Sequence, residues 1–255
     1  MNTVQSALAL SLVPGVGPAA YRELVELHGS AKAAWRARPT GVAEQVARRR
    51  ADNIVLRAAD CGAVGIAQED PMYPESILEL TNAPPVLFAI GDMTALSAPC
   101  VAIVGTRSAT GYGEFVTREL ATALARAGAT IVSGMARGID AAAHRAALAA
   151  GGKTVAVLGT GVDIAYPTAH RELHRQIGEH GLLLSEELPG DRASAGSFPR
   201  RNRIIAALAR VTLVVEAPVK SGALTTANHA LELGRTVAAV PGPIDSPQSA
   251  GSNEL

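Results

Sequence analysis

The sequence has very few cysteines: Cys61 and Cys100 are the only two among 255 residues. Two isolated thiols make neither a disulfide framework nor a zinc cluster, so we expect a reducing, cytoplasmic environment. Glycine, proline or charge interrupts every apolar run before it reaches membrane-spanning length, and no basic segment marks a signal peptide. Lys and Arg equal Asp and Glu at 23 each, which argues against a general binder of polyanions. Any anion site must therefore be a local patch.

The N-terminal part of the chain predicts short helices. Apolar residues recur at helical spacing, and a Pro-Gly-Val-Gly-Pro breaker at 14–18 separates the first two helices. This pattern predicts a small all-α domain over residues 1–60, of the helix–hairpin–helix or SAM-like kind. Such a hairpin either offers N–H groups to a phosphate or only packs two helices. Residues 61–98 contain many prolines and predict a connector, with one strand at 86–90.

From residue 99 to residue 255, short apolar runs alternate with Ala-rich helical stretches. The apolar runs, which predict strands, are 101–104, 130–132, 155–158, 182–184, 211–215 and 237–240. The helical stretches are 113–127, 139–150, 169–179, 204–209 and 223–233. Continuous apolar strands alternating with helices indicate a parallel sheet covered on both faces. We therefore predict an α/β fold with an extended Rossmann-like parallel sheet, mixed at its edge, after the small all-α domain.

Glycine-bearing turns follow three successive predicted strands. They are Gly105-Thr106-Arg107, Ser133-Gly134-Met135-Ala136-Arg137-Gly138 and Gly159-Thr160-Gly161. Ligands of an open parallel sheet bind outside the carboxyl ends of its strands. Glycine lets a phosphate approach the backbone, and helix N-termini present free N–H groups. We predict a phosphate-bearing ligand at this edge; the alternative is that the glycines only allow tight turns.

The known nucleotide signatures are missing from these turns. The G-x-G-x-x-G spacing is not matched at Gly105, and Ser133-Gly134 stands where a ribose-binding acid is expected, so NAD is disfavoured. The chain also lacks a G-x-x-x-x-G-K-[ST] P-loop. The sequence therefore predicts no bound cofactor.

A second basic segment lies at 198–203, where Phe-Pro-Arg-Arg-Asn-Arg places three arginines within four residues. Arginine makes bidentate phosphate contacts and stacks on bases. A helix N-terminus favours anions, so cations at this place indicate a bound anion; the alternative is that they only face water. Tyr112, Tyr166 and Phe198 fall in the same loops as these basic turns. They are candidates for stacking on unpaired bases or for sealing the edge of the core.

The sequence offers no convincing catalytic or metal site. Asp140 and His144, like His170 and His174, are four residues apart on a predicted helix, but neither pair has a third partner at a recognisable spacing. We interpret both as helix-surface pairs. Glu186-Glu187 and Glu216 are a possible acidic pair whose distance the sequence does not give. We assign no catalytic residue and no metal ligand.

Taken together, these segments resemble the DNA-processing protein A (DprA/Smf) family. The resemblance rests on Tyr73-Pro74 with Pro84-Pro85-Val86-Leu87-Phe88, then VAIVGTRSATGYG, IVSGMARGIDAAAH, GGKTVAVLGTGVDIAYP, SFPRRNRIIAALA and VVEAPVKSGALTTANHALELGRTVAAVPG. These segments cover roughly residues 70–245 in the right order. The helical N-terminal segment also looks like the small domain that often precedes this core.

The resemblance implies a recombination mediator that binds single-stranded DNA and has no enzymatic activity. It also implies a homodimer, loading of the RecA recombinase onto the DNA, and protection of incoming strands during natural transformation of competent cells. Carried over to matching positions, the expected DNA-binding residues are Gly105, Thr106, Arg107, Ser133, Gly134, Arg137, Gly138, Gly159, Gly161, Pro167, Arg171, Phe198, Arg200, Arg201, Asn202, Arg203 and Lys220.

The sequence departs from the family pattern in two places. Thr168 stands where a lysine is expected and His170 where an asparagine is expected, so any contact from that lysine shifts to Arg171 or is lost. The sequence ends with residues 251–255, inside a motif that normally continues, so the winged-helix domain of many members is expected to be absent.

Two other functions compete with DNA binding. The glycine turns could hold a mononucleotide in a Rossmann-like hydrolase that cleaves the glycosidic bond of nucleoside monophosphates. Such enzymes usually carry a P-G-G-x-G-T-x-x-E signature, whereas Pro241-Gly242-Pro243 follows the last predicted strand here. A purely structural adaptor, dimerising through its Ala-rich helices, is the third possibility.

Overall fold

The computed structural model describes residues 1–38, 41–194 and 196–255. The chain begins with four helices, α1 (Thr3–Ser11), α2 (Pro18–His28), α3 (Ala31–Ala37) and α4 (Val42–Asp60). Local signals explain their ends. Asn2 and Gln5 form a capping box at α1, Pro18 occupies the first turn of α2, and Gly29 ends α2 in the left-handed conformation at φ 79°.

One mixed sheet organises the rest of the described chain. Its strands are β1 (Val64–Ala67), β2 (Val86–Gly91), β3 (Cys100–Val104), β4 (Thr130–Ser133), β5 (Thr154–Leu158), β6 (Leu182–Ser185), β7 (Val211–Val214) and β8 (Thr236–Ala239). Their spatial order is β1-β2-β6-β5-β4-β3-β7-β8. The six strands from β3 to β8 are parallel, whereas β2 runs antiparallel to both β1 and β6. The predicted α/β fold with a parallel sheet that is mixed at its edge is confirmed.

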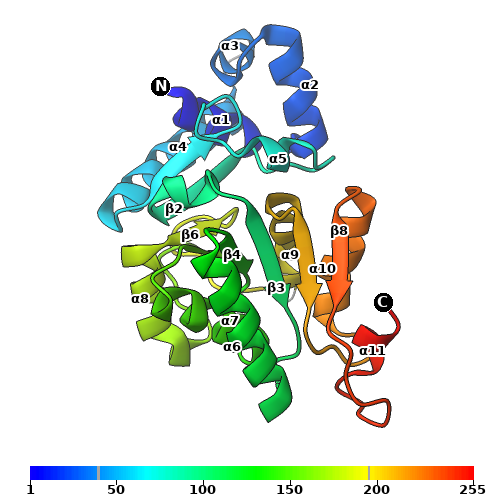
Figure 1. Cartoon of the computed structure of the whole chain (residues 1–255). Coiled ribbons are helices and arrows are strands. Elements are labelled where there is room, and N and C mark those ends of the chain that lie inside the picture. Colours follow the sequence, from blue (N-terminus) through cyan, green and yellow to red (C-terminus); the bar gives the residue numbers. More distant parts are fainter. Residues whose placement is uncertain (39–40, 195) are drawn as a thin grey trace.

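Helices cover both faces of this sheet (Figure 1). The further helices are α5 (Glu75–Leu78), α6 (Gly111–Arg126), α7 (Ile139–Ala149), α8 (Arg171–His180), α9 (Ser197–Leu208), α10 (Gly222–Glu232) and α11 (Ala250–Asn253), with single 3-10 turns η1 (Met93–Leu96) and η2 (Thr168–His170). Successive strand residues point to opposite faces, so Ala102 and Val104 pack toward α9 and α10, while Ile103 packs toward α6 and α7. Apolar cores therefore lie on both faces of β3.

The segment at 61–98 contributes strands to the sheet. It contains β1, α5, β2 and η1, and β2 lies where the sequence predicts a strand. Ala67 and Phe88 of these strands share an apolar core with Leu10 and Tyr21 of the N-terminal helices. The division into domains at 1–60, 61–98 and 99–255 stays a prediction.

The helix that carries the basic segment starts earlier than the sequence predicts. We expected a helix at 204–209, but α9 begins at Ser197 and includes residues 198–203. Among the described residues, no helix combines the length and apolar character that crossing a membrane would require.

Candidate functional site

The turns after β3 and β4 lie against each other at the carboxyl edge of the sheet. The Thr106 N–H donates to the Glu216 carbonyl after β7 (2.7 Å), and the Thr106 carbonyl accepts from the Ile139 N–H at the start of α7 (3.2 Å). Gly138 has φ 73°, and a Cβ there would collide with the Thr106 carbonyl. The predicted convergence of these two turns at one edge is therefore present.

The other glycines of this edge also allow close packing between elements. A Cβ at Gly134 would meet the Arg201 guanidinium at 2.5 Å, and one at Gly159 would meet the Phe198 ring at 2.8 Å. A Cβ at Gly161 would meet the Leu188 carbonyl at 2.5 Å. The interpretation that the glycines serve tight packing thus has structural support of its own, and a ligand contact at these positions stays a prediction.

Arg201 is buried beneath the edge and holds β4 and β5 together. Its guanidinium donates to the Gly134 carbonyl (2.7 Å) and to the Val157 carbonyl. Burial lowers the pKa of Arg201 to about 10, although the Asp140 carboxylate opposes this effect. Asp140 accepts from the N–H groups of Gly134 (3.2 Å) and Ala136 (3.3 Å), and burial raises its pKa against the influence of Arg201. This buried pair fixes the β4–α7 turn.

Arg203 and Arg200 pair with the acidic residues that follow β6. The Arg203 guanidinium donates to both Glu186 oxygens at 2.8 Å and to the side chain of Asn82 at 2.9 Å. Arg200 is more exposed and pairs with Glu187 and, at 3.4 Å, with Glu186. These two glutamates are therefore paired with arginines and do not pair with Glu216. The Glu216 carboxylate accepts from the N–H of Thr110 at 2.9 Å and from its hydroxyl.

Exposed cations and aromatic rings lie together above this buried layer. The guanidinium carbon of Arg107 lies 5.7 Å from the centroid of the Phe198 ring. The rings of Phe198 and Tyr166 have centroids 5.1 Å apart, at an interplanar angle of 36°. Arg137 is exposed on the adjacent turn. Tyr112 lies elsewhere, since its hydroxyl donates to the Pro241 carbonyl.

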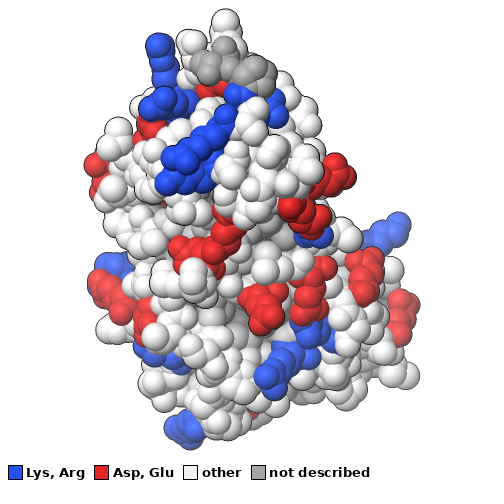
Figure 2. All heavy atoms as spheres, turned by 90° about the horizontal axis from the view of Figure 1, so that it is seen from above, with Lys and Arg blue, Asp and Glu red and all other residues white. Residues whose placement is uncertain are grey.

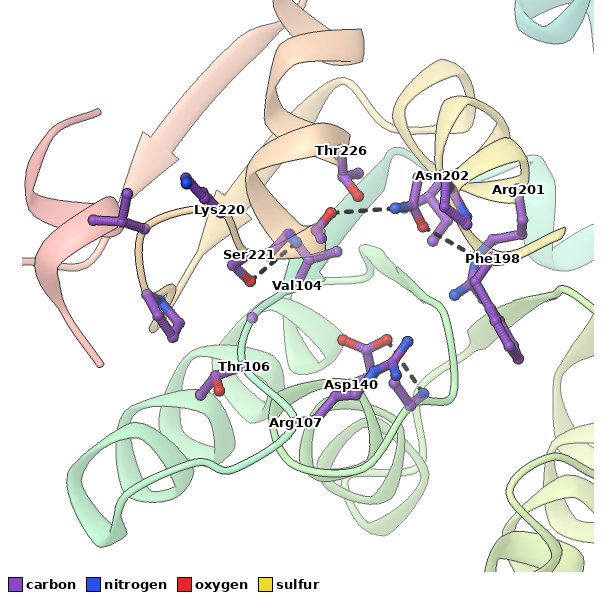
Figure 3. Close-up of a pocket in the computed structure, with 18 residues that line it drawn as sticks. Val104, Thr106, Arg107, Asp140, Phe198, Arg201, Asn202, Lys220, Ser221 and Thr226 are labelled. Atoms are coloured by element: carbon purple, nitrogen blue, oxygen red, sulfur yellow. Dashed lines mark hydrogen bonds between the residues drawn. The ribbon is translucent and has the colours of Figure 1, made fainter. Parts of the chain in front are cut away.

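Two neighbouring cavities open at this edge. The larger, about 470 Å³, lies between the Gly105–Arg107 turn, the start of α9 and the turn that begins α10 (Figure 3). The smaller, about 50 Å³, is lined by Arg137, Tyr166 and Pro167 among others. The two share the side chains of Arg107, Ala136, Phe198, Arg201. They therefore form one continuous polar and aromatic surface.

The structure brings most of the predicted site residues to these cavities. Those that line one or both are Gly105, Thr106, Arg107, Gly134, Arg137, Pro167, Phe198, Arg201, Asn202 and Lys220. Ser133 is buried below the edge, where its hydroxyl donates to the Ile103 carbonyl at 2.6 Å. Gly138, Gly159 and Gly161 shape the turns without lining either cavity. Arg171 is exposed at the start of α8, and Arg200 and Arg203 face the glutamates after β6.

Sequence reasoning missed two parts of this site. Asp140 lines the larger cavity, and so does the start of α10 with Ser221, Gly222 and Thr226. The α10 start had a usable signal, because Ser221-Gly222 after the β7 strand is typical of a helix N-cap at the ligand-binding edge. Asp140 had none, since its role depends on Arg201, which is distant in sequence.

The interpretation of the two acid and histidine pairs as helix-surface pairs is wrong. Asp140 and His144 are buried, and His170 is buried with its Nδ1 donating to the Met135 carbonyl at 3.1 Å. His174 is partly buried and its Nε2 donates to the Val162 carbonyl at 2.8 Å. Apolar residues pack on two sides of α7 and bury Asp140 and His144, whereas His170 lies in η2, before α8 begins, and is buried against the β4–α7 turn. No group of three His, Cys, Asp or Glu side chains suited to a metal ion occurs in the described part of the chain.

Comparison with known proteins places this geometry in a family. The model of the family described as DNA recombination-mediator protein A matches residues 65–255. Protein Smf of Synechocystis is 40% identical over 97% of this chain and 67% of its own length. A putative DNA processing protein DprA of Mycobacterium tuberculosis is 50% identical over 68% of this chain. The chain spans only 45% of that protein.

Solved structures agree with the sequence comparison. The crystal structure of DNA processing protein A from Streptococcus pneumoniae covers all of this chain and 93% of its own, with a TM-score of 0.87 and 34% identity. DNA processing protein A from Helicobacter pylori, described with a unique single-stranded DNA binding mode, covers 76% of this chain and 86% of its own, with a TM-score of 0.70 and 34% identity. The resemblance found in the sequence is confirmed: the chain belongs to the DNA recombination-mediator protein A family.

Proposed function

We propose that this chain binds single-stranded DNA along the carboxyl edge of its sheet. The observation that carries the proposal is the stack formed by Arg107, Phe198 and Tyr166 beside two cavities. Aromatic faces stack on unpaired bases of any sequence, and an exposed guanidinium beside them pairs with the phosphate between two bases. The Helicobacter pylori protein, whose structure is described with a unique single-stranded DNA binding mode, supports the same proposal.

The residues of the site divide into two roles under this proposal. Arg107 and Arg137 are exposed and contact phosphates, while Phe198 and Tyr166 stack on bases. The Arg201 guanidinium donates hydrogen bonds to the Gly134 and Val157 carbonyls. Under this proposal it therefore positions the turn after β4 and does not contact the DNA directly.

The remaining predicted residues act through the same edge. Gly105, Thr106, Ser133, Gly134, Gly138, Gly159, Gly161 and Pro167 shape the turns, Asn202 and Lys220 face the larger cavity, Arg203 braces α9, and Arg200 and Arg171 extend the basic surface. These roles are part of the proposal.

We also propose that the protein is a binding protein and not an enzyme. The two carboxylates at this edge already accept hydrogen bonds from backbone N–H groups. Asp140 accepts from Gly134 and Ala136, and Glu216 accepts from Thr110. The wider role that we propose is that of a cytoplasmic homodimer. It loads the RecA recombinase onto single strands and protects incoming DNA in natural transformation.

The test is a titration of a labelled oligothymidylate and of a duplex by fluorescence anisotropy at two salt concentrations. The single strand should bind more tightly than the duplex, because the aromatic stack needs unpaired bases. Arg107→Ala should weaken single-strand binding about tenfold, the value of one charge-assisted contact. It should also flatten the salt dependence by about 0.7 in log–log slope, since one phosphate contact is lost.

Arg118→Ala is the matched control, because Arg118 also lies over a phenylalanine ring, that of Phe115, at 5.8 Å from its centroid but on the surface of α6. This variant should bind as the unmodified protein does. Equal affinity of the Arg107 and Arg118 variants would contradict the proposed site.

A further inference from the structure

A group of arginines on α4 carries positive charge that the proposed site does not use. Arg48, Arg49, Arg50 and Arg57 are all exposed, and none of them forms an ion pair within the described part of the chain. Residues 1–60 hold eight Lys and Arg against five Asp and Glu, whereas the whole chain is balanced at 23 each. Lys and Arg side chains predominate at one end of the face that the N-terminal helices occupy (Figure 2). The excess of positive charge therefore lies on these helices.

Two of these arginines lie on one flank of α4. The buried face of the helix consists of small and apolar side chains, at Ala47, Ala51, Ile54 and Ala58. An α-helix turns once in 3.6 residues, so Arg50 and Arg57 lie on the same flank, about 10 Å apart along the axis. Arg49 and Asn53 are exposed beside them. The one acid between Arg50 and Arg57, Asp52, is turned toward α1, where it accepts from the Gln5 amide (3.3 Å).

This flank of α4 meets the carboxyl edge of the sheet. Val162, in the turn after β5, and Leu188, in the loop after β6, share an apolar core with the buried face of α4. The Arg57 guanidinium lies against the loop after β6, since a Cβ at Gly190 would be 2.6 Å from it. The turn after β5 continues from Val162 to Tyr166 of the aromatic stack. Arg57 therefore adjoins the loops that border the proposed DNA site.

The loop between the aromatic stack and α4 contains cations of its own. Arg192 is exposed and lies in the chain between Gly190 and the start of α9. Arg200 is half exposed, although it pairs with Glu187. The Asp163 carboxylate accepts from the Gly190 N–H (2.8 Å). A strand that leaves the aromatic stack along this loop would meet Arg192 first and the flank of α4 next.

We propose that α4 extends the DNA site, with Arg49, Arg50 and Arg57 contacting phosphates of the strand that the carboxyl edge holds. The inference rests on the proposed function, because the edge must hold the strand first. Guanidinium groups bind phosphates in bidentate fashion and need no particular base sequence. An acidic protein would also be attracted to this flank. The strand is the better occupant because Arg57 adjoins the loop system that carries Tyr166.

The experiment compares strand lengths on the full chain. Oligothymidylates of about 6 and about 20 nucleotides, near the lower limit and beyond the upper limit of the site sizes of single-strand-binding folds, are titrated by fluorescence anisotropy at two salt concentrations. The double variant Arg50→Ala/Arg57→Ala should bind the long strand about tenfold to a hundredfold more weakly. Its log–log salt slope should fall by about 1.4, since two phosphate contacts are lost. Binding of the short strand should not change, because the carboxyl edge alone holds it.

Two further variants serve as controls. Arg118→Ala/Arg126→Ala removes the same charge from the exposed surface of α6 and should bind both lengths as the unmodified protein does. Arg107→Ala should weaken binding of both lengths, because it acts at the edge. Alanine favours helix, and the substituted side chains of α4 are exposed, so the double variant should keep the circular dichroism and the urea midpoint of the unmodified protein.

The outcomes separate this inference from the proposed function. If the α4 variant binds both lengths as the unmodified protein does, the inference is overturned, while short-strand binding that depends on Arg107 upholds the function. A loss confined to duplex binding also overturns the inference, because α4 would then hold a different DNA. Long-strand binding that depends on α4 but not on Arg107 upholds α4 as a DNA-binding surface and overturns the proposed function. An absence of binding at either length overturns both.

Discussion

The buried histidine of α7 makes the stability of this protein depend on pH. His144 is inaccessible to solvent, its Nδ1 donates to the Thr154 hydroxyl at 2.7 Å, and its Nε2 has no partner among the residues described. Burial, helped by the positive charge of Arg201, lowers the pKa of His144 from 6.5 to about 3. Between these two values the unfolded chain takes up a proton and the folded protein does not. The contribution of His144 to stability is therefore fully present above pH 6.5 and is lost progressively as the pH falls toward 3.

We expect this histidine to contribute a loss of about 2 kcal/mol in the free energy of unfolding between pH 7 and pH 5. Urea unfolding at the two pH values measures it. His144→Gln removes the titrating group, so the variant should lose less stability over the same interval. Groups such as Asp140 titrate in both proteins, and the difference between them therefore isolates His144. Identical losses in the two proteins would contradict the assignment.

The arginines of α9 mark the limit of what the sequence could predict at this scale. Three cations within four residues indicate an anion site, and the sequence offers no reason to separate them. The fold gives these arginines different partners. Arg201 donates to the carbonyls of Gly134 and Val157, and Arg203 donates to the Glu186 carboxylate. Those partners are brought close only by the sheet. Arg107, by contrast, lies in a turn that the strand pattern places at the carboxyl edge. Phe198 lies in the first turn of α9, and the structure places its ring centroid 5.7 Å from the guanidinium carbon of Arg107.

At the scale of elements, strand positions follow from the sequence more closely than helix starts do. All six parallel strands lie within one residue of the predicted bounds, because each is a short apolar run between turn residues. β1 was not predicted, since Val64–Ala67 contains a glycine and pairs only at the sheet edge. The early start of α9 was also missed. Its first turns carry buried arginines, which in a sequence look like a solvated segment.

The turn that joins β4 to α7 provides a test at the same scale. Gly138 has φ 73° and ψ −127°, and a Cβ there would collide with the Thr106 carbonyl. Gly138→Ala should therefore separate the two turns of the edge and cost about 3 kcal/mol or more in the free energy of unfolding. Gly151 has nearly the same φ, 72°, but a Cβ there would meet nothing within 4 Å. Gly151→Ala should cost only about 1 kcal/mol.

Urea unfolding of the two variants measures the difference, and the oligothymidylate titration measures its consequence. Only Gly138→Ala should also weaken single-strand binding, because it displaces the Arg107 turn. Equal costs for the two substitutions would mean that backbone strain alone matters and that contact between the turns does not.

At the scale of the whole molecule, the N-terminal helices and the sheet share apolar surface. Tyr21 and Leu10 of the helices pack in one core with Phe88 and Val86 of β2. Figure 2 shows a contrast in charge over the face that these helices occupy: Lys and Arg side chains predominate at its upper end, and Asp and Glu side chains form a band across its middle. Apolar burial at the junction favours joint unfolding, whereas a separate small domain would unfold alone.

The single tryptophan distinguishes these two cases. Trp35 lies on α3 and packs against the shared core, so its fluorescence reports the N-terminal helices, while far-ultraviolet circular dichroism reports all helices and strands. We expect the two signals to change together in a urea titration, with the same midpoint. The physical reason is that losing the helices would expose Phe88 and Val86, at about 1.5–3 kcal/mol for each large apolar side chain. A tryptophan transition at lower urea than the dichroism transition would instead establish residues 1–60 as an autonomous domain.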